Sequence, residues 1–192
     1  MDILYNKQHF LNLLQCVQRQ GISQLNQYLC NSDFFTAPAS VKYHDNYEGG
    51  LCQHSLNVYR YLVKLDDFYK THLSKESMII VGLLHDLCKV DFYVPTKRNQ
   101  KIDGKWQEVD TYTYNDDFPC GHGEKSVFRI MQFIKLNKQE ILAINWHMGA
   151  YDVRADQFNQ LDSAYRISPL TFLLHQADMS ATYMGVENEA GN

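Results

Sequence analysis

The feature that most constrains the fold of this chain is an apolar segment, residues 78–84, that runs directly into His85-Asp86. Ser74 is a suitable N-cap residue, so the sequence predicts a helix over about residues 75–89. Because this helix is apolar nearly all round, we expect it to lie buried at the centre of a helical fold. Asp86 continues its buried face, and a buried carboxylate is costly unless a cation compensates it.

Most of the remaining chain also carries apolar residues at helical spacing. The pattern predicts further helices over about residues 2–19, 22–29, 51–69, 124–136, 138–147 and 169–184. The last of these has a well-defined start, because Ser168 can cap it and Pro169 suits the first helical position. Residues 31–50 and 156–167 are polar and are expected as loops, the second with room for a short helix. The predicted fold class is therefore all-α.

A different pattern interrupts the helices at residues 92–114, where Asp103-Gly104 separates two stretches rich in Tyr, Thr, Val and Trp. Asp-Gly between such stretches predicts a β-hairpin, since a type I′ turn needs positive φ at both central residues. We expect one hairpin inserted in a bundle of helices. Its position directly after the central helix makes it a candidate for a lid or an edge of a substrate site.

The length of the chain suggests a single domain over residues 1–192, because this length can bury one full hydrophobic core. Within it, residues 1–50 are expected as an N-terminal helical extension and loop, and residues 51–184 as the core. No N-terminal signal sequence is evident, and the longest apolar run is far shorter than the roughly 20 residues of a membrane span. We therefore expect a cytoplasmic protein that makes no membrane contact.

The charge balance limits the partners. Net charge is −4 with histidine neutral, and the lysines and arginines do not cluster. A protein that binds long duplex DNA usually needs a basic surface to neutralise phosphates, so we expect no such partner. A small phosphorylated ligand, such as a nucleotide or a short oligonucleotide, stays compatible because bound metal ions can supply positive charge locally.

Cysteine usage gives no motif. Five cysteines are scattered along the chain and never paired at short spacing: Cys16, Cys30, Cys52, Cys88 and Cys120. A structural zinc site of thiolates would need such pairs. We therefore expect free thiols in or near the core.

Polar residues also stand on two other helix faces that are otherwise apolar. His54 lies in the core-facing stripe of its predicted helix, and Asp178 lies on the apolar face of the last helix. Each alone is more often a structural residue with a local partner, and Lys89 is a simple partner for His85-Asp86. Three such intrusions together, however, indicate a metal centre, which compensates buried charge.

Two more histidines extend this set. His122 stands between two glycines, which suit a tight helix entry, and His147 ends a predicted helix. The ordered candidates for metal ligands are His54, His85, Asp86, His122, His147 and Asp178. All six lie within residues 51–184, which we therefore expect as the metal-binding core. Imidazole and carboxylate in this mixture suit Zn, Mn, Fe, Ni or Co rather than Ca.

The ordered set resembles the HD superfamily, whose domains are helical bundles around a metal centre, over roughly residues 51–182. The intervening His122 and His147 resemble its binuclear branch. The resemblance implies two divalent transition-metal ions bridged by Asp86. One ion would be held by His54, His85 and Asp178, and the other by His122 and His147.

Superfamily members commonly hydrolyse phosphomonoesters or phosphodiesters. The resemblance therefore implies a metal-dependent phosphohydrolase that acts on a nucleotide or a similar small phosphorylated substrate. GLLHDLCK resembles the superfamily's His-Asp-x-x-Lys variant, which assigns Asp86 and Lys89 to catalysis and Lys89 also to substrate phosphate. Composition alone adds Tyr43, His44 and Arg98 as substrate contacts, since a base stacks well on an aromatic ring.

Two alternatives stay open. The same ligand order occurs in a minor branch of the superfamily that activates O₂ at a mixed-valent di-iron centre, and such ligands accept iron as readily as manganese or zinc. The other alternative is a non-catalytic module, in which metals stabilise a nucleotide-binding fold. The sequence leaves the substrate, the native metal and the oligomeric state undetermined.

Overall fold

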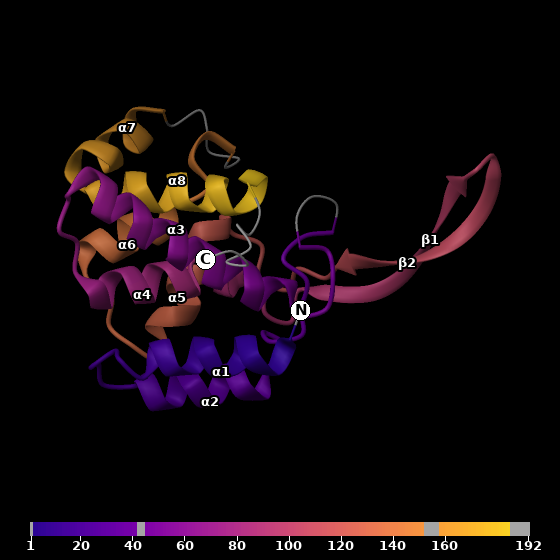
Figure 1. The fold of residues 1–192 in the computed structure, drawn as a ribbon, viewed down its shortest axis with the longest axis horizontal. Helices are drawn as coiled ribbons and strands as arrows, with labels where there is room; N and C mark the ends of the chain where they lie inside the picture. Colours follow the sequence, from indigo (N-terminus) through magenta and orange to yellow (C-terminus); the bar gives the residue numbers. More distant parts are fainter. Residues whose placement is uncertain (1, 42–44, 152–157, 185–192) are drawn as a thin grey trace, which may run out of the picture.

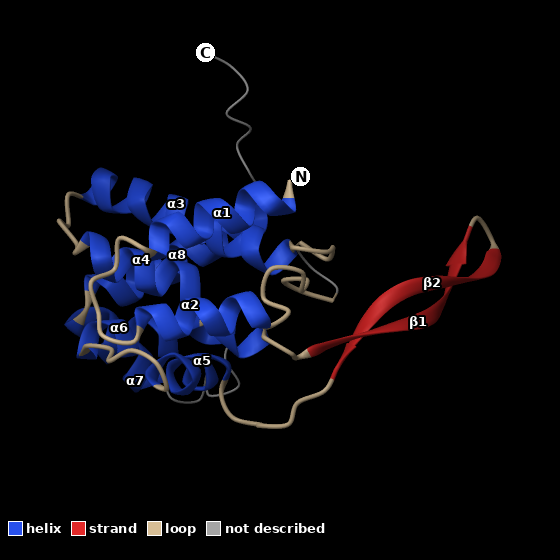
Figure 2. Cartoon of the chain, turned by 90° about the horizontal axis from the view of Figure 1, so that it is seen from below, coloured by secondary structure: helices blue, strands red, loops and turns tan. Residues whose placement is uncertain are grey.

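A computed structural model describes residues 2–41, 45–151 and 158–184 of the chain. Figure 1 shows a body of packed helices from which one long hairpin projects, and Figure 2 shows the same division from below. The helices are α1 (Ile3–Leu14), α2 (Ile22–Asn31), α3 (Gly50–Tyr69), α4 (Lys75–Leu84), α5 (His122–Met131), α6 (Lys138–Asn145), α7 (Phe158–Ile167) and α8 (Pro169–Met184). Short 3₁₀ turns lie at η1 (Leu87–Lys89) and η2 (Gly149–Tyr151), and the strands are β1 (Tyr93–Ile102) and β2 (Lys105–Tyr114).

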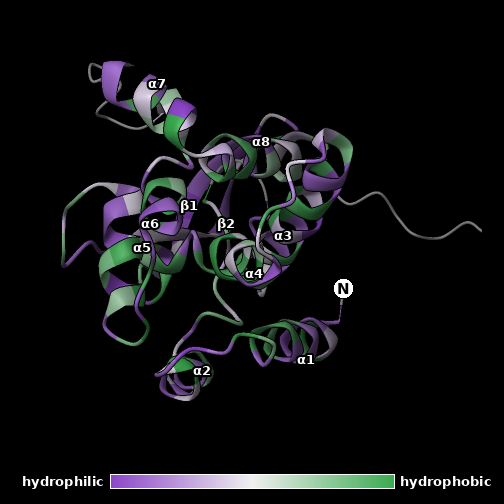
Figure 3. Cartoon of the chain, turned by 90° about the vertical axis from the view of Figure 1, so that its left-hand side faces the viewer, coloured by the Kyte–Doolittle hydropathy of each residue, from purple (hydrophilic) through white to green (hydrophobic). Residues whose placement is uncertain are grey.

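The apolar helix α4 lies in the core, as its sequence predicts. Every residue from Ser77 to Leu84 is buried. Gly82 lets α3 pack closely against α4, because a Cβ at Gly82 would lie 2.8 Å from the Cα of Tyr59. Figure 3 shows both polar and apolar residues on most of the surrounding helices, as expected for helices with one buried face.

The N-terminal helices share this core. Phe10 and Leu14 of α1 and Leu25 and Leu29 of α2 are fully buried in the same hydrophobic cluster as α4. In Figure 1 the two helices cover one flank of the body. Their burial means that α1 and α2 fold together with the helices that carry the candidate ligands.

The hairpin forms as the Asp-Gly signal predicts. β1 and β2 pair antiparallel from Tyr93 opposite Tyr114 to Ile102 opposite Lys105. The turn residues Asp103 and Gly104 have φ values of 51° and 80°, the positive values that a type I′ turn requires. Most hairpin side chains are exposed, because the ribbon extends away from the helical body (Figures 1 and 2).

The central helix is shorter than expected. It ends at Leu84, and His85 and Asp86 lie in the turn that leads into η1. Asp86 has φ −102° and ψ 23°, outside the helical region, and its carbonyl accepts the Lys89 N–H at 3.0 Å. The predicted helix over residues 75–89 was therefore wrong in its last turn.

Three further differences concern where helices lie. The helix predicted over residues 124–136 is α5, which ends at Met131. The first helix ends at Leu14 rather than near residue 19. A complete helix, α7, occupies residues 158–167, where we expected mainly loop. Leu161 and Ala164 of α7 pack on Trp146, a tertiary contact that a polar local sequence does not reveal.

No helix in the described ranges is long and apolar enough to cross a lipid bilayer.

Candidate metal centre

Five helical segments converge on one buried cluster of imidazoles and carboxylates. His54 lies on α3, and His85 and Asp86 lie in the turn after α4. His122 is the first residue of α5, His147 follows the end of α6 by two residues, and Asp178 lies on α8. All except the half-buried His122 are buried. The structure thus brings together all six residues that the sequence singled out as ligands.

The two carboxylate oxygens of Asp86 face different histidines. Oδ1 lies 3.2 Å from Nε2 of His122 and 3.5 Å from Nε2 of His147. Oδ2 lies 3.4 Å from Nε2 of His85 and 3.7 Å from Nε2 of His54. Asp86 therefore stands between two pairs of imidazoles, with one oxygen toward each pair.

Asp178 completes the group around Oδ2. Its Oδ1 lies 3.0 Å from Nε2 of His54 and 4.0 Å from Nε2 of His85. One side of Asp86 is thus bordered by two imidazoles and a second carboxylate, and the other side by two imidazoles. We call these the first position (His54, His85, Asp178) and the second position (His122, His147).

The spacing of these atoms fits ligands that share a metal ion. Metal–nitrogen and metal–oxygen bonds of roughly 2.0–2.2 Å separate neighbouring ligand atoms by about 2.9–3.4 Å and opposite ones by about 4.1 Å. The measured nitrogen–oxygen separations run from 3.0 Å to 4.0 Å. The donor set, imidazole with carboxylate, suits first-row transition metals.

Two of the histidines are held in the tautomer that a metal requires. Nδ1 of His85 donates to the carbonyl of Gly82 at 3.0 Å, and Nδ1 of His147 donates to that of Ile144 at 2.7 Å. Nε2 of each ring is then an acceptor, and both Nε2 atoms are buried with no hydrogen-bond partner among the described residues. A buried lone pair beside a carboxylate oxygen is stabilised by a cation between them.

The local structure around His122 explains how it reaches the cluster. A Cβ at Gly123 would lie 2.4 Å from the carbonyl oxygens of both Ile144 and Asn145, so only glycine permits α5 to approach α6 this closely. Glu124 accepts the Gly121 N–H at 3.1 Å and closes the start of α5. Glu124, which is the acid in the first turn, thus helps to fix the helix end that carries His122.

The electrostatics keep Asp86 ionised. Burial opposes ionisation, but Lys89 and His85 hold the pKa of the Asp86 carboxyl well below its ordinary value. The Lys89 ammonium lies 2.7 Å from Oδ2 of Asp86. Burial disfavours the charged lysine, yet Asp86 raises its pKa above the ordinary value. A charged acceptor and a charged donor therefore coexist in the core.

The predicted substrate residues have different outcomes. Lys89 is buried and paired with Asp86, so it is part of the cluster and not a solvated lysine at a helix end. Arg98 lies on the exposed part of β1, where it donates to Gln100 at 3.2 Å, and the structure does not bring it to the cluster. Tyr43 and His44 lie outside the described residues.

Cys88 is a neighbour of the cluster that sequence reasoning missed. Its Sγ, a carboxylate oxygen of Asp86 and a ring nitrogen of His122 all lie within 4.8 Å of one another. Only the position of Cys88, two residues after Asp86, could have drawn attention to it. The expectation that all the thiols lie in or near the core was wrong for Cys16, which is exposed in the turn after α1, and for Cys30, which is exposed on α2.

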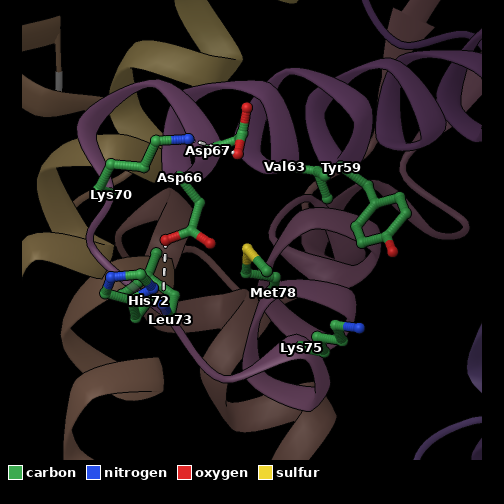
Figure 4. A pocket seen from close by; sticks show the side chains of 9 residues that line it. All are labelled: Tyr59, Val63, Asp66, Asp67, Lys70, His72, Leu73, Lys75 and Met78. Atoms are coloured by element: carbon green, nitrogen blue, oxygen red, sulfur yellow. Dashed lines mark hydrogen bonds and ion pairs between the residues drawn. The ribbon is translucent and has the colours of Figure 1, made fainter.

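Apart from the cluster, a hollow lies between the end of α3 and the start of α4 (Figure 4). Its carboxylates already stabilise local structure. Asp66 accepts hydrogen bonds from Thr71 and from the Leu73 N–H, at 2.6 Å and 3.0 Å, and Asp67 pairs with Lys70. These contacts shape the loop between the two helices, so we assign no chemistry to this hollow.

Comparisons with known proteins give one informative result. The chain is similar to the dihydroneopterin 2′,3′-cyclic phosphate phosphodiesterase of Methanocaldococcus jannaschii, with 31% identity over 98 residues. The match covers 43% of this chain and 37% of that protein. No family model matches the chain, and no solved structure does. The name of that protein describes a phosphodiesterase that acts on a small cyclic phosphate.

Proposed function

We propose that this chain is a metal-dependent phosphohydrolase of the HD type. One observation carries the proposal: each carboxylate oxygen of Asp86 faces its own pair of histidines, the arrangement that a carboxylate bridging two ions requires. The similarity to a cyclic phosphate phosphodiesterase supports the reaction class. The match covers only 37% of that protein, so the proposed activity of this chain rests on the cluster as much as on the similarity.

The proposed ligand sets follow the two sides of Asp86. His54, His85 and Asp178 would hold one divalent transition-metal ion with Oδ2, and His122 and His147 would hold the other with Oδ1. The second position contains the most exposed of the candidate histidines, His122, whose side chain is 35% exposed. It is therefore the side on which water and substrate would have access.

The chain's own residues would organise the reaction. Bound ions supply positive charge for the phosphoryl oxygens and activate water for attack at phosphorus. The carbonyls of Gly82 and Ile144 hold His85 and His147 in the required tautomer. Lys89 orients Asp86 and adds positive charge beside the position of the transferred phosphoryl group. As the water oxygen forms its bond to phosphorus, the bond between phosphorus and the leaving oxygen breaks, and that oxygen takes up a proton released from the water.

The proposed substrate is a phosphodiester, or the corresponding monoester, of a nucleotide or similar small molecule. A cyclic phosphodiester is the first probe to use, given the activity named for the relative. Tyr43 and His44 remain predicted contacts for its base. Arg98 could contribute only if the substrate extended along the hairpin.

The test combines metal content with hydrolysis. The protein, purified without chelator, is assayed for bound metals per chain and then for hydrolysis of a 2′,3′-cyclic nucleotide with Mn, Zn, Fe, Ni or Co added. We expect about two ions per chain and metal-dependent ring opening. Asp86→Asn should abolish both the metal binding and the ring opening. Asp67→Asn is the matched control, because the side chain of Asp67 is 82% exposed on α3 and lies away from the cluster.

Other outcomes would overturn the proposal. Fewer than one ion per chain, even after soaking with these metals, would remove its basis. Bound iron whose spectrum changes with O₂, together with O₂ uptake, would establish the oxygenase alternative. A nucleotide that binds tightly and stays chemically unchanged would establish a binding module.

A further inference from the structure

Cys88 occupies an unusual place for a lone buried thiol. It lies in η1, two residues after Asp86, and is 3% exposed. Its backbone N–H donates to the hydroxyl of Ser126 on α5 at 3.0 Å, which fixes η1 against the helix that begins with His122. The thiol sulfur, an Asp86 oxygen and a His122 nitrogen lie within 4.8 Å of one another.

We propose that Cys88 is a thiolate ligand of the metal ion at the second position, beside His122, His147 and Asp86. This inference rests on the proposed function, since it adds a ligand to the same centre. It gives the second position a sulfur donor that the first position lacks. The two ions would then sit in chemically different surroundings.

An independent observation points to a ligand on the same side of Asp86. Nε2 of His147 is fully buried, has no hydrogen-bond partner among the described residues, and lies 3.5 Å from Oδ1 of Asp86. Oδ1 is also the oxygen that faces His122, at 3.2 Å. A cation between Oδ1 of Asp86, His122 and His147 would satisfy this buried lone pair, and the Cys88 thiol lies within 4.8 Å of a ring nitrogen of His122.

The distances allow direct coordination. With a metal–sulfur bond of about 2.3 Å and a metal–nitrogen bond of about 2.0 Å, tetrahedral ligands would place sulfur and nitrogen about 3.5 Å apart. The sulfur and the His122 nitrogen lie within 4.8 Å of each other, so a small rotation of the thiol would suffice to bring both onto one ion. On binding, the S–H bond breaks, the sulfur forms its bond to the metal and the proton leaves to solvent.

A thiolate would change which metals the second position prefers. Soft sulfur favours zinc, cobalt and iron, whereas a site of oxygen and nitrogen alone also accepts manganese and magnesium. The second position should therefore retain zinc or cobalt when the first exchanges its ion for manganese. Oxidation of the thiol would remove that ligand, so the centre should also lose metal on peroxide treatment.

The test uses cobalt as a spectroscopic probe in the full chain. Cobalt(II) bound to a thiolate gives a sulfur-to-metal charge-transfer band in the near ultraviolet. We expect this band in the wild-type protein and in Cys52→Ser and Cys120→Ser, and its loss in Cys88→Ser. Cys52 is an equally buried thiol on α3, at 2% exposure, and Cys120 is the cysteine next to Gly121, so both are matched controls.

X-ray absorption of the cobalt-loaded wild type provides a second readout that needs no variant. A cobalt–sulfur shell near about 2.3 Å is expected. Two bound cobalt ions with only nitrogen and oxygen neighbours would overturn the thiolate assignment and leave the proposed function standing. Failure of the wild type to bind cobalt at all would overturn both.

Discussion

Gly123 at the start of α5 touches the backbone at the end of α6, where a Cβ would lie 2.4 Å from the carbonyl oxygen of Asn145. His122 precedes Gly123, and His147 follows Asn145 by two residues. This helix contact therefore sets the spacing of the two imidazoles at the second position, whose ring centroids lie 5.9 Å apart. A backbone contact thus controls the geometry of one half of the cluster.

Gly123→Ala should separate α5 from α6 and weaken the second position. The added methyl group meets two carbonyl oxygens that cannot rotate away, so the helices must move, at a cost of about 1–3 kcal/mol. We expect loss of one of the two metal ions with helix content retained, measured by elemental analysis and circular dichroism. Gly82→Ala is the reciprocal variant, because its methyl group would push α3 from α4 beside His54 and His85. Equal metal content in wild type and Gly123→Ala would contradict this account.

Asp86→Asn and Asp178→Asn should differ in how many ions they lose. Asp86 faces both positions, whereas Asp178 lies near His54 and His85 of the first position only. We expect Asp86→Asn to retain neither ion and Asp178→Asn to retain the second. The rate of hydrolysis should fall by more than about 100-fold in both variants, which exceeds the usual effect of losing a residue that only hydrogen-bonds to a metal ligand. Identical metal loss in the two variants would argue against a bridging role for Asp86.

Glu140→Ala should be strongly destabilising, because Glu140 is a fully buried carboxylate at the centre of a polar network. It accepts two hydrogen bonds of 2.7 Å from Arg19, one from Ser77 and one from the Asn137 N–H. Its removal leaves the Arg19 guanidinium without its main partner, so the free energy of unfolding should fall by about 3–5 kcal/mol. Urea denaturation followed by circular dichroism measures the change.

The control for that measurement is an exposed ion pair. Arg166 and Asp162 pair on the surface of α7 at 2.7 Å, with side chains 77% and 60% exposed. Arg166→Ala should leave the urea midpoint unchanged, because solvent screens such pairs. A similar loss of unfolding free energy in Glu140→Ala and Arg166→Ala would show that the Glu140 network contributes no more than a surface ion pair.

Local sequence signals predicted the parts of this molecule that depend on local structure. The hairpin follows from Asp103-Gly104, and the start of α8 from Ser168-Pro169, because turn and cap chemistry is set within a few residues. The convergence of the six candidate ligands could be anticipated because polar residues interrupted apolar helix faces. Their role as ligands stays a prediction.

What the sequence could not reveal depends on distant packing. α4 ends at Leu84 because the chain turns there to place Asp86 among residues from four other segments, although the local pattern continues as helix. Cys88 carries no spacing motif, and its nearness to His122 arises only when η1 packs on α5. The direction in which the hairpin projects (Figure 1) was equally hidden. Arg98, which the composition suggested as a substrate contact, is exposed on β1, and its role stays a prediction.

Removal of the hairpin arm should separate its role from that of the helical body. Tyr93 and Tyr114 are direct partners at its base, so residues 94–113 can be replaced by Asn-Gly, which closes a two-residue turn. Since the removed side chains are mostly exposed and a lone hairpin adds little stability, the free energy of unfolding should change by less than about 1 kcal/mol. Metal content should also stay the same, because none of the six candidate ligands lies in the arm.

If the arm forms an edge of the substrate site, KM for the cyclic nucleotide should rise while kcat is retained. Loss of metal or of the helical fold would instead show that the arm supports the body, and unchanged KM would show that this substrate does not touch it.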